Sequence, residues 1–169
     1  MYFLVQDSSP STTASSSKND GVQKKVTDTI RTNIKTMSFV DENDKKLHFL
    51  VCGHQISQHL LCFVHAVNDW QLRLAIIDSM YKKYKDDINF VMINIVDGSR
   101  EKLGAGQKYF ADKGYDFTYY YVNNLIAADS VGVKYIPTMY VLDKDGEIKF
   151  AYEVNQSQNQ LESNFKAVI

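Results

Sequence analysis

Short apolar segments alternate with segments of helical period along much of this chain, and that alternation restricts the folds it can adopt. Residues 59–65 (HLLCFVH) and 88–96 (INFVMINIV) are apolar runs of strand length, typical of strands buried on both faces. Between them, from Trp70 to Tyr84, apolar residues recur at the spacing of a helix. A strand, a helix and a second strand in this order favour two parallel strands joined by a crossover helix.

The remaining segments extend the same pattern. The sequence predicts an early hairpin, two further helices between strands, a late hairpin and a C-terminal helix that carries Leu161, Phe165 and Val168. The ranges are 37–40 with 45–49, 100–113, 117–122, 125–131, and 138–142 with 147–152. This order predicts an α/β three-layer sandwich: a mixed central sheet with helices on both faces and an N-terminal hairpin.

Size and composition favour one domain preceded by a tail. The chain has 169 residues, 44% of them hydrophobic and 23% charged, which is ordinary for a globular protein. Residues 7–21 are small and polar, with a Ser/Thr-rich stretch (SSPSTTASSS) at 8–17, and cannot bury apolar area. We therefore expect a flexible Ser/Thr-rich tail or linker over residues 1–35 and a folded domain over 36–169. A four-residue spacing of Val22, Val26, Ile30 and Ile34 is a helical signal within that tail.

Charge and hydropathy exclude some classes of partner. The formal net charge is −1, which argues against a nucleic-acid partner held by phosphate contacts. No apolar run is long enough for a transmembrane segment. The start of the chain, MYFLV, is too short for a signal-peptide core. Two interpretations follow: a cytoplasmic protein, or an extracytoplasmic one whose Ser-rich linker follows a removed signal or a membrane anchor.

The late hairpin begins with a motif that carries a resemblance. Residues 136–146 read IPTMYVLDKDG, and they follow AADSVGV at 127–133. Together with MYKKYKDD at 80–87 and VMIN at 91–94, these segments resemble the thioredoxin-like superfamily, in particular the TlpA/ResA-type thiol–disulfide oxidoreductases. The resemblance covers residues 36–169. It implies that Pro137 is cis and that its loop faces a Cys-x-x-Cys motif at a helix start.

The resemblance fails where the chemistry of that family resides. Its two cysteines correspond here to Val67 and Trp70, and Cys62 comes five residues too early to replace the first of them. Residues 48–76 as a whole differ from the family. Disulfide exchange needs an accessible thiolate, activated at a helix N-terminus, and a second cysteine that resolves the mixed disulfide. We therefore expect dithiol exchange to be absent.

Two functions remain open on these grounds. The first is a redox-inactive binding or scaffold domain, with a protein or peptide partner in a groove formed by Asn68, Asp69, Trp70, Ile136 and Pro137. In the opposing interpretation, Trp70 simply fills the former active-site space. The second function is a thiol–disulfide oxidoreductase that uses Cys62 alone or has lost its motif from an active parent. Neither function calls for a cofactor.

A third possibility is a metal site. Soft sulfur and imidazole ligands suit zinc or copper, and five such residues lie close together: Cys52, His54, His59, Cys62 and His65. Their spacing matches no common ligand pattern, and alternation along a strand would turn Cys62 and His65 to opposite faces. The simpler interpretation is that Cys52 and Cys62 are free thiols that form no cycling disulfide.

Overall fold

A computed structural model describes residues 22–41, 43–48, 58–64, 71–96, 104–122, 125–154 and 156–169. Within these ranges, eight strands form one sheet in the order β1-β8-β7-β4-β5-β6-β2-β3. Only β4, β5 and β6 run parallel to one another, so the sheet is mixed. The strands are β1 (Val22–Gln23), β2 (Ser38–Val40), β3 (Lys46–His48), β4 (Gln58–Val64), β5 (Ile88–Ile95), β6 (Thr118–Val122), β7 (Thr138–Leu142) and β8 (Ile148–Glu153).

The two apolar runs of the sequence are the two central strands. β4 pairs with β5 in parallel, from Gln58 opposite Ile88 to Val64 opposite Asn94. The helix α3 (Gln71–Tyr84) connects them, and every residue of β4 from His59 to Val64 is buried. The predicted parallel pair with its crossover helix is therefore confirmed.

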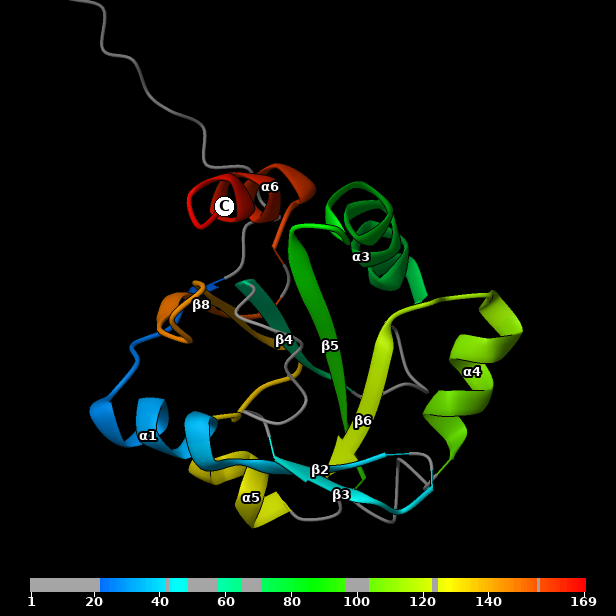
Figure 1. Cartoon of the computed structure of the whole chain (residues 1–169), viewed down its shortest axis with the longest axis horizontal. Helices are drawn as coiled ribbons and strands as arrows, with labels where there is room; N and C mark the ends of the chain where they lie inside the picture. The colour runs from blue at the N-terminus through cyan, green and yellow to red at the C-terminus, as the bar shows by residue number, and fades with distance from the viewer. Residues whose placement is uncertain are drawn as a thin grey trace, which may run out of the picture.

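Helices cover both faces of the sheet, which confirms the predicted three-layer sandwich (Figure 1). One face packs against α1 (Asp28–Thr36) and α5 (Leu125–Ser130), and its core includes Ile34, Phe39 and Tyr140. The other face packs against α3, α4 (Ala105–Lys113) and α6 (Gln158–Lys166), and its core includes Leu74 and Phe165. The predicted early hairpin is present as β2 and β3, which pair antiparallel.

The predicted start of the folded domain at residue 36 is wrong. β1 pairs with β8, with Val22 opposite Glu153, and Lys24 forms an ion pair with Glu153 at 2.5 Å. In α1 the side chain of Ile34 is only 1% exposed and belongs to the core. Residues 22–35 therefore belong to the domain, because their four-residue apolar spacing places one face of α1 on the sheet.

Helix α4 also begins later than the sequence predicted. It starts at Ala105 instead of residue 100, directly after Gly104, whose φ of 80° lies in the left-handed region. At its other end Gly114, with φ 68°, ends the helix as predicted, because glycine adopts this left-handed cap without a steric penalty.

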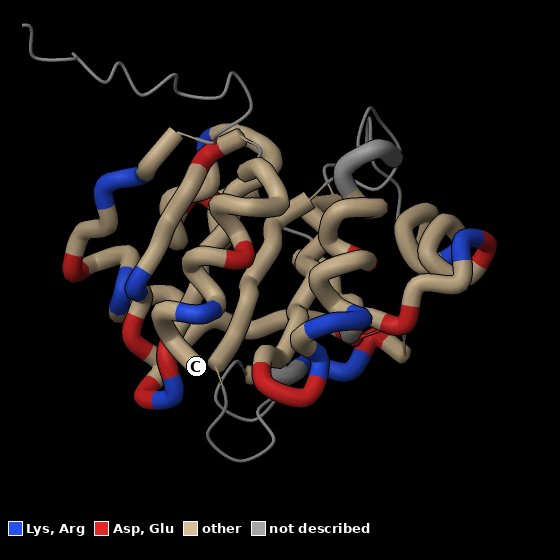
Figure 2. Tube along the Cα trace, turned by 90° about the horizontal axis from the view of Figure 1, so that it is seen from above, with Lys and Arg blue, Asp and Glu red and all other residues tan. Residues whose placement is uncertain are grey.

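Basic and acidic residues are interspersed along the chain, as Figure 2 shows, instead of gathering in regions of one sign. No helix in the described ranges is long and apolar enough to cross a membrane.

Candidate functional site

The carboxyl ends of the parallel strands meet at one edge of the sheet, where α/β proteins commonly bind ligands. β4 ends there at Val64, and Phe63 of that strand lies opposite Thr138, the first residue of β7. The loop that enters β7, with Ile136 and Pro137, therefore lies beside the end of β4.

The loop before β7 is fixed on both sides by hydrogen bonds. The peptide bond between Ile136 and Pro137 is cis. The buried hydroxyl of Thr138 donates to the carbonyl oxygen of Tyr135 at 2.7 Å and closes the turn. From the end of β8, the backbone N–H of Val154 donates to the carbonyl oxygen of Pro137 at 2.8 Å. The loop is thus held from within and from the neighbouring strand.

Two exposed residues flank this loop, and a buried glutamine follows one of them in the sequence. Tyr135 is 63% exposed and Val154 is 45% exposed, although both carry large apolar groups. Val154 also has a φ of 61°, which is a true outlier for a β-branched residue and a mark of local strain. Gln156 is 4% exposed, and neither its amide nitrogen nor its amide oxygen has a hydrogen-bond partner among the described atoms.

We refer to the loop and the two exposed residues together as the proline edge, which comprises Tyr135, Ile136, Pro137 and Val154. The sequence predicted two of them, Ile136 and Pro137. It missed the others because they follow β8 or precede the motif, and they meet the loop only through strand pairing. The pairing of Thr138 with Glu153, which places Val154 beside Pro137, is the geometric signal that unites them.

The remaining predicted groove residues, Asn68, Asp69 and Trp70, lie outside the described residues, and so does Val67. The flanking elements are described: β4 ends at Val64 and α3 begins at Gln71. The prediction that the groove includes residues 68–70 therefore stays a prediction.

Cys62 lies in the middle of the sheet and is fully buried. It pairs with Met92 of β5 on one side and Met139 of β7 on the other. Burial raises the pKa of its thiol well above the ordinary range, which keeps it protonated. Because the thiolate is the reactive form, Cys62 is chemically inert in this position. Cys52 lies outside the described residues.

The predicted metal ligands are described only in part. His59 and Cys62 both belong to β4, but they are three positions apart, and alternation turns such residues to opposite faces of a strand. Cys62 packs in the core beneath α3, whereas Leu61 and Phe63, on the alternate face with His59, pack beneath α1. These two residues therefore do not converge on one ion. The part of the chain that the structure describes holds no group of three His, Cys, Asp or Glu residues placed to bind a metal, and Cys52, His54 and His65 lie outside it.

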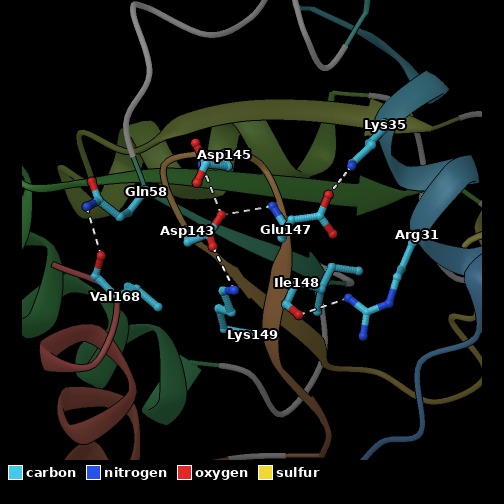
Figure 3. A network of polar contacts seen from close by, with 9 residues as sticks. All are labelled: Arg31, Lys35, Gln58, Asp143, Asp145, Glu147, Ile148, Lys149 and Val168. Atoms are coloured by element: carbon cyan, nitrogen blue, oxygen red, sulfur yellow. Dashed lines mark hydrogen bonds and ion pairs between the residues drawn. The ribbon is translucent and has the colours of Figure 1, made fainter.

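The opposite end of the sheet carries a polar network around the β7–β8 turn, which we call the turn network (Figure 3). The Oδ1 atom of Asp143 accepts the backbone N–H groups of Asp145 and Glu147 at 2.9 and 3.0 Å, and its Oδ2 atom lies 2.9 Å from the Lys149 ammonium. Burial alone would raise the pKa of Asp143, but Lys149 and the two N–H groups outweigh it and lower that pKa. Lys35 of α1 pairs with Glu147 in the same way.

Comparison with known proteins places the fold. The sequence matches no family model and no curated protein. Among solved structures, it is similar to a secreted Mycobacterium tuberculosis disulfide oxidoreductase, with 17% identity and a TM-score of 0.63, over 80% of this chain and 98% of that one. It is also similar to a thioredoxin-like protein from Aeropyrum pernix, with 16% identity and a TM-score of 0.66, over 79% of this chain and 90% of that one. A third similar structure is the exposed lipoprotein thioredoxin Etrx1 from Streptococcus pneumoniae, with 16% identity and a TM-score of 0.60, over 78% of this chain and 98% of that one. The chain therefore has the thioredoxin-like fold that its sequence predicted.

Proposed function

We propose that this chain is a redox-inactive thioredoxin-like protein of TlpA type, which binds an extended segment of a partner protein at the proline edge. The observation that carries this proposal is the state of its thiols. The sequence holds two cysteines, neither in a Cys-x-x-Cys motif, and Cys62 is fully buried in the central sheet. The scaffold is therefore retained without the thiolate pair that disulfide exchange requires.

The proline edge supports the binding half of the proposal. Exposed apolar side chains beside backbone of fixed geometry suit an extended peptide, which contributes main-chain hydrogen bonds and side chains for shallow pockets. Tyr135 and Val154 supply the apolar surface. Asn68, Asp69 and Trp70 complete this groove in the proposal.

Location outside the cytoplasm forms part of the same proposal. The Ser-rich segment at residues 7–21 has the composition of a linker between a membrane anchor and a folded domain. Two proteins of similar fold are described as secreted and as an exposed lipoprotein. We accordingly propose an extracytoplasmic protein that is tethered to a membrane in its full-length form.

Binding of an unfolded chain without cysteine chemistry tests the proposal. The probe is reduced and carboxymethylated lactalbumin, which is extended and has no free thiol, and the readout is isothermal titration calorimetry. We expect Tyr135→Ser to weaken binding about tenfold, because exposed aromatic anchors contribute about 1–2 kcal/mol each. Ile169→Ser is the matched control, since Ile169 is 55% exposed at the C-terminus, near Gln58 and the turn network. Equal weakening by both variants, or no binding by the unmodified chain, would contradict the proposal.

A second candidate is supported by the comparisons. A protein of similar fold is described as a disulfide oxidoreductase. For this chain, such activity would have to use a single cysteine, and the burial of Cys62 argues against that residue. A Cys52→Ser variant distinguishes the candidates, because an oxidoreductase that depends on Cys52 loses its activity, whereas peptide binding at the proline edge does not change.

A further inference from the structure

An open groove lies on the other side of the molecule from α1, where α4 and β6 approach the turn between β2 and β3 (Figure 1). Its volume is about 400 Å³, which suits a small organic molecule or one long side chain. The groove is lined mostly by aromatic residues: Asp41, Gln107, Phe110, Ala111, Tyr115, Phe117, Tyr119 and Tyr120. We call it the aromatic groove.

The rings of the aromatic groove hold one another in place. Tyr115 stacks on Phe117, with centroids 5.2 Å apart and an interplanar angle of 27°. Phe110 meets Tyr119 at 4.7 Å and Phe117 at 5.9 Å, both edge to face. Phe110 and Phe117 are buried, whereas Tyr115 and Tyr119 are half-buried and form part of the accessible wall. The four rings therefore form a continuous aromatic wall, part of which is accessible.

The charge at the aromatic groove is negative. Asp41 is the charged residue among the described lining residues, and its Oδ1 atom accepts the backbone N–H groups of Asn43 and Lys45, both at 2.9 Å. That turn fixes the carboxylate at the mouth of the groove. Its field reaches β6, because burial and then the charges of Asp44 and Asp41 raise the pKa of Tyr121.

Basic side chains on the adjacent helix α4 are engaged elsewhere. Lys108 forms an ion pair with Asp112 at 2.9 Å. The ammonium of Lys113 lies over the ring of Tyr109, 5.8 Å from its centroid. Tyr109 belongs to the same aromatic cluster, since it lies 6.2 Å from Phe110. The protein's own lysine thus shows the kind of contact that these rings make.

We propose that the aromatic groove binds a small organic cation of the quaternary or methylated ammonium class. Aromatic faces attract such cations through their quadrupole, and the effect grows when a carboxylate stands nearby and water is partly excluded. The fixed carboxylate of Asp41 and the rings of Tyr115 and Tyr119 supply both components. An anionic ligand would face the charge of Asp41 without a basic partner in the described lining. This site is separate from the proline edge and does not depend on the function proposed for it.

Two probes of equal shape test the charge requirement on the unmodified chain. Choline is a quaternary ammonium ion, and 3,3-dimethylbutan-1-ol is its neutral isostere. Each is titrated while the ring resonances of the tyrosines and phenylalanines are followed by NMR. We expect choline to shift the signals of Tyr115 and Tyr119 and to bind at least about fivefold more tightly than the isostere. Equal affinity of the two probes, or no shift of these signals with choline, would overturn the proposal.

Variants locate the site. Asp41→Asn removes the charge while its amide oxygen still accepts the N–H groups of the turn, and we expect it to weaken choline binding about fivefold. Tyr115→Leu keeps an apolar side chain against Phe117 and is expected to weaken binding by a similar factor. Leu125→Ala is the control, because Leu125 is 57% exposed on α5 and does not line the aromatic groove. If Asp41→Asn binds choline as tightly as that control does, the assignment is wrong.

Discussion

The two ends of the β7–β8 strand pair are built in opposite ways. At the turn network, Asp143 satisfies two backbone N–H groups and an ammonium, and Lys35 of α1 reaches Glu147. At the proline edge, Val154 adopts a strained backbone conformation and remains 45% exposed. Both ends belong to the same pair of antiparallel strands, so the contrast arises from the residues at each end.

The two ends therefore differ in how they affect the stability of the sheet. Polar groups at the turn network are paired in ways that lower the free energy of the folded state. The proline edge keeps features that raise it, and such features are typical of functional sites, where the surrounding structure holds a residue in place. The edge also lies at the carboxyl ends of the parallel strands, where ligands of α/β sheets commonly bind.

The largest expected effect comes from restoring the dithiol that the resemblance implies. The resemblance assigns the family's cysteines to Val67 and Trp70. We expect the double variant Val67→Cys with Trp70→Cys to gain insulin-reductase activity from a background of none, because the resemblance implies that these two positions hold the family's dithiol at a helix start, where residues three apart face each other. The control is Trp70→Cys alone, which lacks a resolving thiol. A folded double variant whose two introduced cysteines cannot pair would contradict our placement of this site.

At the turn network, Asp143→Ala removes two hydrogen bonds to backbone and one ion pair. We expect the free energy of unfolding to fall by about 1–2 kcal/mol, measured by urea denaturation, because the N–H groups of Asp145 and Glu147 lose their acceptor. Asp145→Ala in the same turn is the control and should change stability by less than about 0.5 kcal/mol. Similar losses in both variants would show that Asp143 has no special role.

At the proline edge, Val154→Asn should raise the free energy of unfolding, whereas Asp143→Ala lowers it. Asparagine tolerates the left-handed conformation that costs a β-branched residue about 1 kcal/mol, so we expect a gain in stability of up to that amount. The hydrogen bond from the backbone of residue 154 to Pro137 remains possible. The same variant should weaken binding of carboxymethylated lactalbumin. A loss of stability would remove the contrast between the two ends.

The smallest effect is a pH dependence confined to the turn network. The pKa of Asp143 and that of Glu147 are lowered in the folded state, and their contribution to stability is therefore present above the ordinary carboxyl pKa of about 4. It is lost as the pH falls through the lower pKa of the folded state. We expect the destabilisation by Asp143→Asn to be measurable at pH 7 and to shrink as the pH falls through the lowered pKa of the native carboxyl, because the native side chain then becomes neutral as well. Equal destabilisation across this pH range would exclude a charge effect.

The sequence predicted the architecture well where hydrophobic pattern alone decides it. Strands β4 and β5 are apolar throughout and needed no tertiary information to be recognised. The start of the domain was wrong because α1 has nine residues and follows a polar tail, and so short a helix depends on packing against the sheet. Its apolar spacing was visible, but the surface that it covers was not.

The candidate site was predicted in part, and one irregularity explains the rest. Near the turn, Leu142 pairs with Ile148, and continuing that register would place Glu153 opposite Pro137. A bulge between Val141 and Leu142 shifts the pairing by one residue, so that Thr138 faces Glu153 and Val154 reaches Pro137. Nothing in the hydrophobic pattern marks that shift, and the sequence alone therefore predicted Ile136 and Pro137 without Val154.

The measurement that tests the central claim most directly is an insulin-reduction assay of the unmodified chain with dithiothreitol, run beside an active thioredoxin. With Cys62 buried in the sheet and no Cys-x-x-Cys motif in the sequence, we predict a rate equal to that of dithiothreitol alone. A rate approaching that of the active thioredoxin would contradict the account, because it would show that this scaffold performs disulfide exchange without a dithiol at the proline edge.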